Sequence, residues 1–147
     1  MRLTTRGHYS VKALLDLALQ PGYGPASVAA IAKRQQLPAP YLEKLLMALR
    51  KADIVKSIRG VQGGYQLKQH PSDISLGHIL EAVGEAIEPL SNQEPNEHHA
   101  GDWVTFALWN KLHQKMKDAL FSISLEDLYY DARSRQAAQG ETTSFIV

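Results

Sequence analysis

The sequence contains no cysteine. This absence excludes disulfide bonds, thiol catalysis and any metal site built from cysteine ligands. The chain also has no secretory signal and no long apolar run, so we expect a soluble, cytoplasmic protein. No phosphate-binding loop or nucleophile elbow occurs, so we do not expect an enzyme. With 147 residues, 44% of them hydrophobic, the chain is long enough for one compact domain with an extension.

Charge is unevenly distributed along the chain, although the formal net charge is only +1. Residues 1–70 hold eleven Lys and Arg against three acids, a net charge of +8. Residues 71–147 hold five basic residues against twelve acids, a net charge of −7. A basic half joined to an acidic half is typical of a nucleic-acid-binding module attached to a module that does not bind nucleic acid.

The stretch from Ser27 to Leu67 predicts two short helices, a tight turn and two strands. Ser27 is a suitable N-cap for the first helix, and the second helix should begin near Pro40. The apolar spacing of the second helix predicts one buried stripe: Leu42, Leu45, Leu46 and Leu49. Strands are expected over 55–59 and 65–67. This order of elements is the pattern of a winged helix-turn-helix, which predicts a DNA-binding module.

The outward face of the second helix is the candidate major-groove surface. It carries Ala39, Tyr41, Glu43, Lys44, Met47, Arg50 and Lys51. A glutamate can accept a hydrogen bond from the amine of cytosine, and a lysine can donate to guanine or to phosphate. Glu43 and Lys44 are therefore the candidate base readers, with Tyr41 beside them. The alternative is that these are ordinary solvated helix positions.

The loop between the strands contains Gly60, Gly63 and Gly64, so its backbone can approach a surface closely. Arg59 precedes this loop and would enter a minor groove, where the negative potential favours arginine. The alternative is a plain hairpin with a surface arginine.

The remaining segments predict helices over about 6–19, 76–83 and 102–121, and a last helix capped by Ser124. Thr4 or Thr5 could cap the first of these, and Arg2 and Thr4 are candidate phosphate contacts at its start, with simple solvent exposure as the alternative. Residues 88–101 predict a flexible loop, and residues 133–147 a polar, loosely held end.

Several blocks of the sequence resemble the Rrf-two (Rrf2) family of bacterial transcription regulators over about residues 1–130. They include Met1-Arg-Leu-Thr-Thr-Arg-Gly, Pro40-Tyr-Leu-Glu-Lys-Leu and Val55-Lys-Ser-Ile-Arg-Gly-Val-Gln-Gly-Gly-Tyr. The resemblance implies a homodimer formed by the long helix and a palindromic operator. The candidate dimer contacts are Trp103, Val104, Leu108, Leu112 and Met116. The alternative is that this apolar surface is buried within one subunit.

Cluster-binding members of that family hold an iron-sulfur cluster with three cysteines before the long helix, but the equivalent stretch here, Leu90 to Asp102, has none. We therefore predict no cofactor and no ordinary iron-sulfur cluster. A metal site remains as an alternative hypothesis. His98 and His99 lie in this loop among acidic residues, and His8 lies near a position where some relatives supply a ligand. The opposing interpretation is that these histidines are solvated.

The sequence thus predicts a mainly α fold with three parts: a winged helix-turn-helix DNA-binding domain over 1–84, a flexible loop over 85–101, and a dimerisation helix with a C-terminal helix and tail over 102–147. The predicted function is a homodimeric transcription regulator that binds double-stranded DNA. Two alternatives are a metal-responsive regulator that uses the loop histidines and a winged-helix interaction module regulated by a partner enzyme.

Overall fold

The computed structural model describes residues 3–85 and 87–146, with side chains as far as residue 140. The chain forms α1 (Thr5–Leu19), η1 (Pro21–Tyr23), α2 (Val28–Gln35), α3 (Ala39–Lys51), β1 (Val55–Ile58), β2 (Gly64–Leu67), η2 (Pro71–Asp73), α4 (Leu76–Ala82), α5 (Ala100–Ser122) and α6 (Leu125–Ile146). Strands β1 and β2 are antiparallel, with Val55 opposite Leu67 and Ile58 opposite Gly64. The mainly helical winged helix-turn-helix predicted from the sequence is confirmed.

The core lies where α1, α2 and α3 pack together, and it is built from the apolar stripes that the sequence predicts. Leu14, Ile31 and Leu46 have no exposed surface. The predicted leucine stripe of α3 is buried throughout. Leu125 at the start of α6 is also fully buried in this core, so the last helix packs against α1 rather than apart from it.

Short polar contacts set where the helices begin. The Ser27 hydroxyl accepts a hydrogen bond from the amide of Ala30 at 3.1 Å, and the Ser75 hydroxyl accepts from the amide of His78 at 3.1 Å. Both caps satisfy amides that have no partner within the helix. Helix α3 begins one residue before Pro40, which sits in the first turn, where its missing amide costs no hydrogen bond.

The base of the wing is joined to the helix-turn-helix by backbone hydrogen bonds. The amide of Ala26 donates to the carbonyl of Tyr65 at 2.9 Å, and the amide of Tyr65 donates back to Ala26 at 2.8 Å. Gly64 makes this approach possible, because a Cβ at that position would lie 2.1 Å from the Ala26 carbonyl oxygen. Strand β2 is thus held between β1 and the segment that leads into α2.

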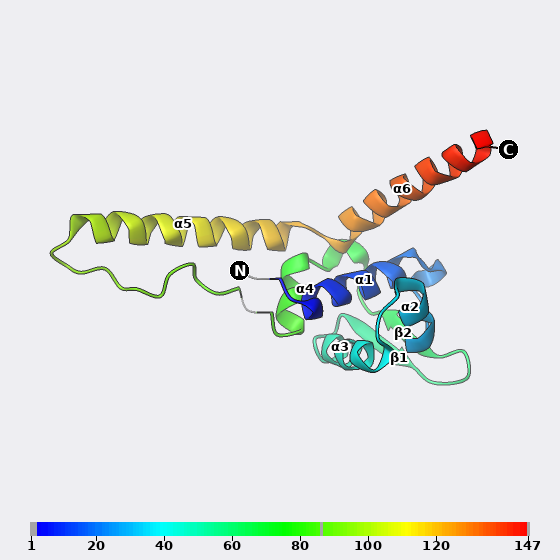
Figure 1. Ribbon diagram of the computed structural model, residues 1–147. Helices are drawn as coiled ribbons and strands as arrows, with labels where there is room; N and C mark the ends of the chain where they lie inside the picture. Colours follow the sequence, from blue (N-terminus) through cyan, green and yellow to red (C-terminus); the bar gives the residue numbers. More distant parts are fainter. Residues whose placement is uncertain (1–2, 86, 147) are drawn as a thin grey trace.

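Helix α5 extends away from the body formed by α1 to α4, and residues 87–99 run beside it toward its first turn (Figure 1). No residue along α5 is buried. At its other end, the Phe121 ring packs on Gly77, where a Cβ would lie 2.7 Å from the ring. The amide of Leu76 also donates to Ile123 at 2.8 Å. The helix is anchored at one end, and none of its residues is buried by the part of the chain that the structure describes.

The polar C-terminal end differs from the sequence prediction. Residues from 133 onward were predicted to be loosely held, but α6 is helical as far as Ile146. Alanines and glutamines between residues 132 and 139 favour a helix, and a reciprocal pair of hydrogen bonds between Ser124 and Asp127 caps its start. Over the described ranges, no helix has both the length and the apolar character required to cross a membrane.

Candidate nucleic-acid interface

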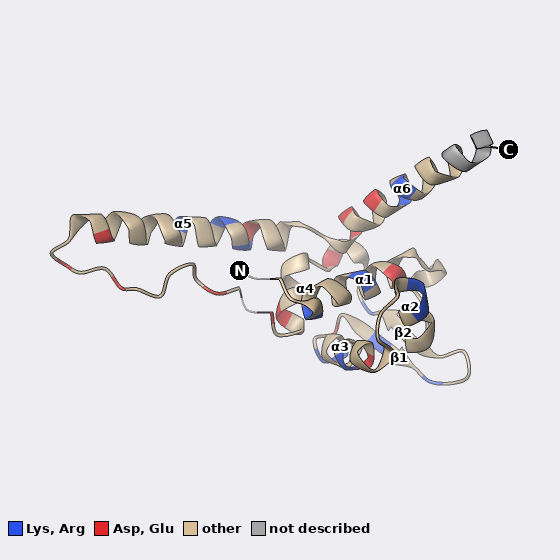
Figure 2. Cartoon of the chain, in the orientation of Figure 1, with Lys and Arg blue, Asp and Glu red and all other residues tan. Residues whose placement is uncertain are grey.

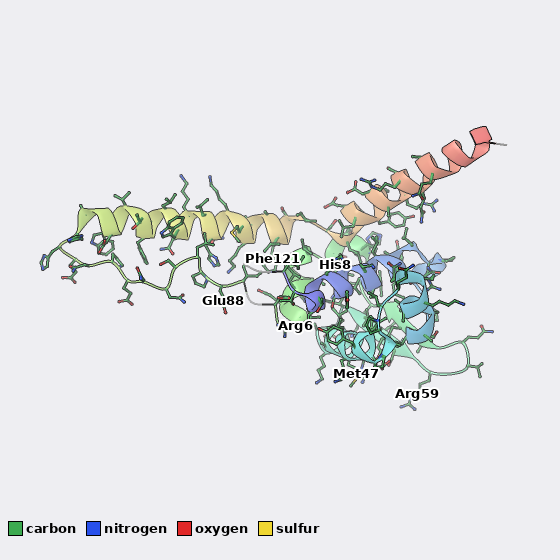
Figure 3. All side chains as sticks on the ribbon, viewed as in Figure 1. Arg6, His8, Met47, Arg59, Glu88 and Phe121 are labelled. Atoms are coloured by element: carbon green, nitrogen blue, oxygen red, sulfur yellow. The ribbon has the colours of Figure 1, made fainter. Side chains whose placement is uncertain are left out.

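The outward face of α3 brings together the side chains that the sequence proposed as a major-groove surface. Lys44, Arg50 and Lys51 are exposed, and Met47 lies among them with 49% of its surface exposed (Figure 3). Tyr41 and Glu43 are half-buried. The Tyr41 ring meets the Tyr9 ring of α1 edge-on, with 6.0 Å between centroids. Tyr41 therefore packs against the body as well as lying on this face.

Glu43 is held by a residue that the sequence reasoning did not select. The Tyr65 hydroxyl donates a hydrogen bond to Oε1 of Glu43 at 3.1 Å. Tyr65 is buried, with 7% of its surface exposed. Burial and then the bond to Glu43 raise the pKa of Tyr65 above its usual value. Its only sequence signal was its position in β2, directly after Gly64.

The wing carries Arg59 at the end of β1, exposed and clear of the helical body (Figure 3). The amide of Gly63 donates to Gly60 at 3.0 Å and closes the turn. A Cβ on Gly63 would lie 2.1 Å from the Ile58 carbonyl oxygen. Gly63 and Gly64 are therefore required by the fold of the wing itself, and their contact with DNA stays a prediction.

Some basic side chains are bonded to other groups of the protein, and others are not. Arg34 pairs with Asp16 at 2.8 Å, Lys68 with Asp53 at 2.8 Å, and the Lys12 ammonium donates to the Gln35 carbonyl at 2.8 Å. On α2, α3 and the wing, six exposed basic side chains form no ion pair with any described residue: Lys33, Lys44, Arg50, Lys51, Lys56 and Arg59. These six side chains are here called the open basic set. Lys and Arg gather on α2, α3 and the wing (Figure 2), so this side of the molecule attracts a polyanion.

The start of α1 does not offer the free amides that the sequence suggested for phosphate. Oε1 of Glu85 accepts hydrogen bonds from the amides of Thr4 and Gly7 at 3.3 Å and 3.1 Å, and from the Thr4 hydroxyl. Thr4 is the N-cap residue of α1, one of the two predicted, but its hydroxyl donates to Glu85 and makes no capping hydrogen bond to the helix. The Thr4 hydroxyl is the main reason that the pKa of Glu85 is lowered. Arg2, the other predicted phosphate contact, lies outside the described residues.

The three histidines considered as metal ligands do not form a ligand set in this chain. His98 and His99 lie just before α5, at the end of that helix far from the body (Figure 1). His8 lies in α1, within the body (Figures 1 and 3). His99 Nδ1 lies 3.8 Å from Oδ1 of Asp102. Within residues 3–85 and 87–140, no group of three histidines or acids converges closely enough to hold a metal ion. Since the sequence has no cysteine, the thiolates that an ordinary iron-sulfur cluster needs do not exist here.

The predicted dimer contacts form an exposed apolar stripe on α5. Trp103, Val104, Leu108 and Leu112 are exposed by 40% to 69%, and Met116 is half-buried. Large apolar side chains in such numbers on one helix indicate a surface for another protein. We call these five residues the α5 stripe.

Helix α3, its open cations and the adjacent wing together define a winged-helix DNA-binding protein. A family model described as an iron-dependent transcriptional regulator, Rrf2, matches residues 3–131. The chain belongs to the Rrf2 family. This is a family of bacterial transcription regulators, not of enzymes.

Similarity to individual proteins extends over most of the chain. The Synechocystis protein slr0846, described as an HTH-type transcriptional regulator, is 64% identical over 100% of both chains. IscR of Pectobacterium atrosepticum is 36% identical over 97% of this chain and 88% of its own length. Among solved structures, CymR, the global cysteine regulator of B. subtilis, has a TM-score of 0.78 and 35% identity over 88% of this chain and 97% of its own. T. potens IscR has a TM-score of 0.73 and 40% identity over 92% and 91%.

Proposed function

We propose that the protein is a cytoplasmic, homodimeric transcription regulator that reads a palindromic operator. The observation that carries this proposal is the open basic set on α2, α3 and the wing. In each subunit, α3 enters the major groove with Glu43 and Lys44 toward the bases, and Arg59 on the wing enters the adjacent minor groove. Arg50, Lys51 and the N-terminal Arg2 contact the phosphate backbone.

The dimer is proposed to form through the α5 stripe. A two-fold pair of α5 helices would cover side chains that have no partner in the described chain. The pairing would place the two α3 helices about 34 Å apart, so that they face successive major grooves on one side of the duplex. The operator would then be a palindrome with half-sites one helical turn apart.

The regulatory signal is proposed to differ from an ordinary cysteine-ligated cluster. The iron-dependent description belongs to the family model, and no thiolate is available in this sequence. We propose that the protein binds its operator without such a cluster. Protein purified without air and analysed for iron and acid-labile sulfide would test this point, and stoichiometric amounts of both would refute it.

Selection of bound fragments from the host genome tests the central proposal. The expected result is a set of fragments that share one palindromic sequence. Binding to a duplex of that sequence should weaken steeply with salt, because counterions are released when cations neutralise phosphates. Arg50→Ala and Lys51→Ala should each reduce the salt dependence by about one counterion. Lys115→Ala on α5, outside the proposed interface, is the matched control. Random fragments with no shared sequence would refute the proposal.

A further inference from the structure

Tyr65 lies where three elements of the candidate interface meet. Its backbone pairs with Ser57 of β1 and with Ala26, the residue before the cap of α2. Its side chain reaches across to α3 and ends at Glu43. One buried residue therefore connects the wing, the helix-turn-helix and the base-reading face.

The contact leaves half of the Glu43 carboxylate available. The Tyr65 hydroxyl occupies Oε1 at 3.1 Å, and Oε2 accepts no hydrogen bond within the described chain. Glu43 also forms no ion pair with a described lysine or arginine, although basic side chains surround it on α3. The free oxygen is the one that could accept from the exocyclic amine of a cytosine.

We infer that Tyr65 is a positioning residue that fixes the Glu43 carboxylate for base discrimination. This inference rests on the proposed function, since it presumes that Glu43 faces the bases. A glutamate side chain has three rotatable bonds, and base choice by hydrogen bonding requires one geometry. The phenol is itself immobile, because it is buried and its backbone is bonded on both sides. It transfers that rigidity to an otherwise mobile carboxylate.

The hydroxyl is suited to this task over the ordinary pH range. The raised pKa of Tyr65 keeps it protonated, so it remains a hydrogen-bond donor. Arg50 is the cation whose charge acts on Tyr65 in the opposite direction, and it is exposed. A bond from a buried neutral donor to a carboxylate is stronger than one between two neutral groups.

Tyr65→Phe tests the inference, because phenylalanine keeps the buried ring and removes only the hydroxyl. The measurement is the ratio of affinities for the operator and for operators with single base-pair substitutions, taken for the parent, Tyr65→Phe, Glu43→Ala and the double variant. Tyr65→Phe should lower this ratio by about threefold to tenfold at the position that Glu43 reads, as expected for one lost geometric constraint on a base contact. The matched control is Tyr23→Phe, which removes a hydroxyl 3.5 Å from His70 Nε2 in the same domain.

The double variant separates positioning from a general effect on folding. If Tyr65 acts through Glu43, then adding Tyr65→Phe to Glu43→Ala changes the ratio no further. The salt dependence should match that of the parent in every variant, since no phosphate contact is removed. A ratio that stays at the parent value in Tyr65→Phe, or losses that multiply in the double variant, overturns the inference. A parent protein with no operator preference overturns the proposed function and the inference together.

A second variant covers the case in which Tyr65→Phe fails to fold. A fluorinated tyrosine incorporated at position 65 keeps both ring and hydroxyl and ionises at a lower pH. Discrimination should equal that of the parent while the hydroxyl is protonated. It should fall as pH rises through the new pKa, where the phenolate repels Glu43. Discrimination that is constant across this pH range overturns the inference.

Discussion

Among single residues, some charged side chains form ion pairs or hydrogen bonds within the protein, and others are exposed to solvent. Asp16 is the clearest internal case, since its side chain is only 3% exposed. It accepts hydrogen bonds from Arg34 at 2.9 Å and 2.8 Å and from Gln35 at 3.0 Å. These bonds connect α1 to α2, and they raise the pKa of Arg34 above its usual value. Arg34 is thus a structural cation within a segment that reads as basic.

Asp16→Ala is expected to lower the free energy of unfolding by about 2 kcal/mol, because it removes a buried acceptor and leaves its donors unpaired. Chemical denaturation measures the effect. Lys68→Ala is the control: its ion pair with Asp53 lies at the surface, and a surface pair of this kind adds little stability. Equal losses in the two variants would contradict the structural role given to Asp16.

Replacing Glu43 and replacing Arg59 are expected to change DNA binding in different ways. Glu43→Ala should relax the choice of base while operator binding remains, because one acceptor at the base edge is lost. Arg59→Ala should lower affinity by roughly tenfold where A/T-rich sequence flanks the half-site, because a narrow minor groove favours arginine. Competition between operator and scrambled duplexes measures both. The assigned roles would be wrong if both variants bound the two duplexes as the parent does.

Within secondary-structure elements, the contact between Glu85 and α1 replaces the usual helix cap. Glu85, which follows the end of α4 at Ala82, supplies the carboxylate that caps the N-terminus of a helix about eighty residues earlier in the chain. Because the folded pKa of Glu85 lies below its ordinary value of 4.5, its contribution to stability is complete above that pH. The contribution is lost as pH falls through the folded pKa.

Glu85→Gln should therefore reduce stability at neutral pH by about 1 kcal/mol, since an amide accepts these hydrogen bonds less strongly than a carboxylate does. The difference in melting temperature between parent and variant should shrink on acidification, because the parent loses the charge. Glu81→Gln on the exposed side of α4 is the control and should behave as the parent. A melting difference that is constant with pH would rule out an ionised Glu85 as the cap.

The sequence could predict those elements that depend on residues close together in the chain. The leucine stripe of α3 and the caps at Ser27 and Ser124 each depend on residues within a few positions, so the local sequence located them. The bonds of Tyr65 to Glu43 and of Glu85 to Thr4 join residues 22 and 81 positions apart. No local pattern marks such pairs. The candidate interface was therefore predicted as a set of exposed residues, but its internal support was not.

For the whole molecule, the main feature is that α5 exposes large apolar side chains to solvent. The apolar residues of this helix could be identified from the sequence, because their spacing along the chain is the same whether or not another subunit covers them. Phe121 and the backbone bonds around Ile123 fix one end of α5 to the body. Among the described residues, four of the five side chains of the α5 stripe are exposed and Met116 is half-buried. Operator affinity should therefore depend on the contacts that pair the α5 helices of two subunits.

Leu108→Lys is expected to convert the dimer to monomers, because a charge replaces a side chain in the centre of the α5 stripe. Sedimentation measures the mass, and operator binding should fall by at least about a hundredfold when two linked half-sites become independent ones. Gln114→Lys adds the same charge at an exposed polar position of α5 and should remain dimeric. A dimeric Leu108→Lys protein would place the subunit contact elsewhere.

The paired amides and carbonyls of Ala26 and Tyr65 have a consequence for the duplex itself. They join the hairpin to the segment that leads into α2, so we expect the distance between the wing and α3 to change little when DNA binds. Any misfit must be absorbed by bending or twisting of the nucleic acid. Operators with flexible steps such as TA or CA between the two contact points should consequently bind more tightly, even though no side chain touches those bases.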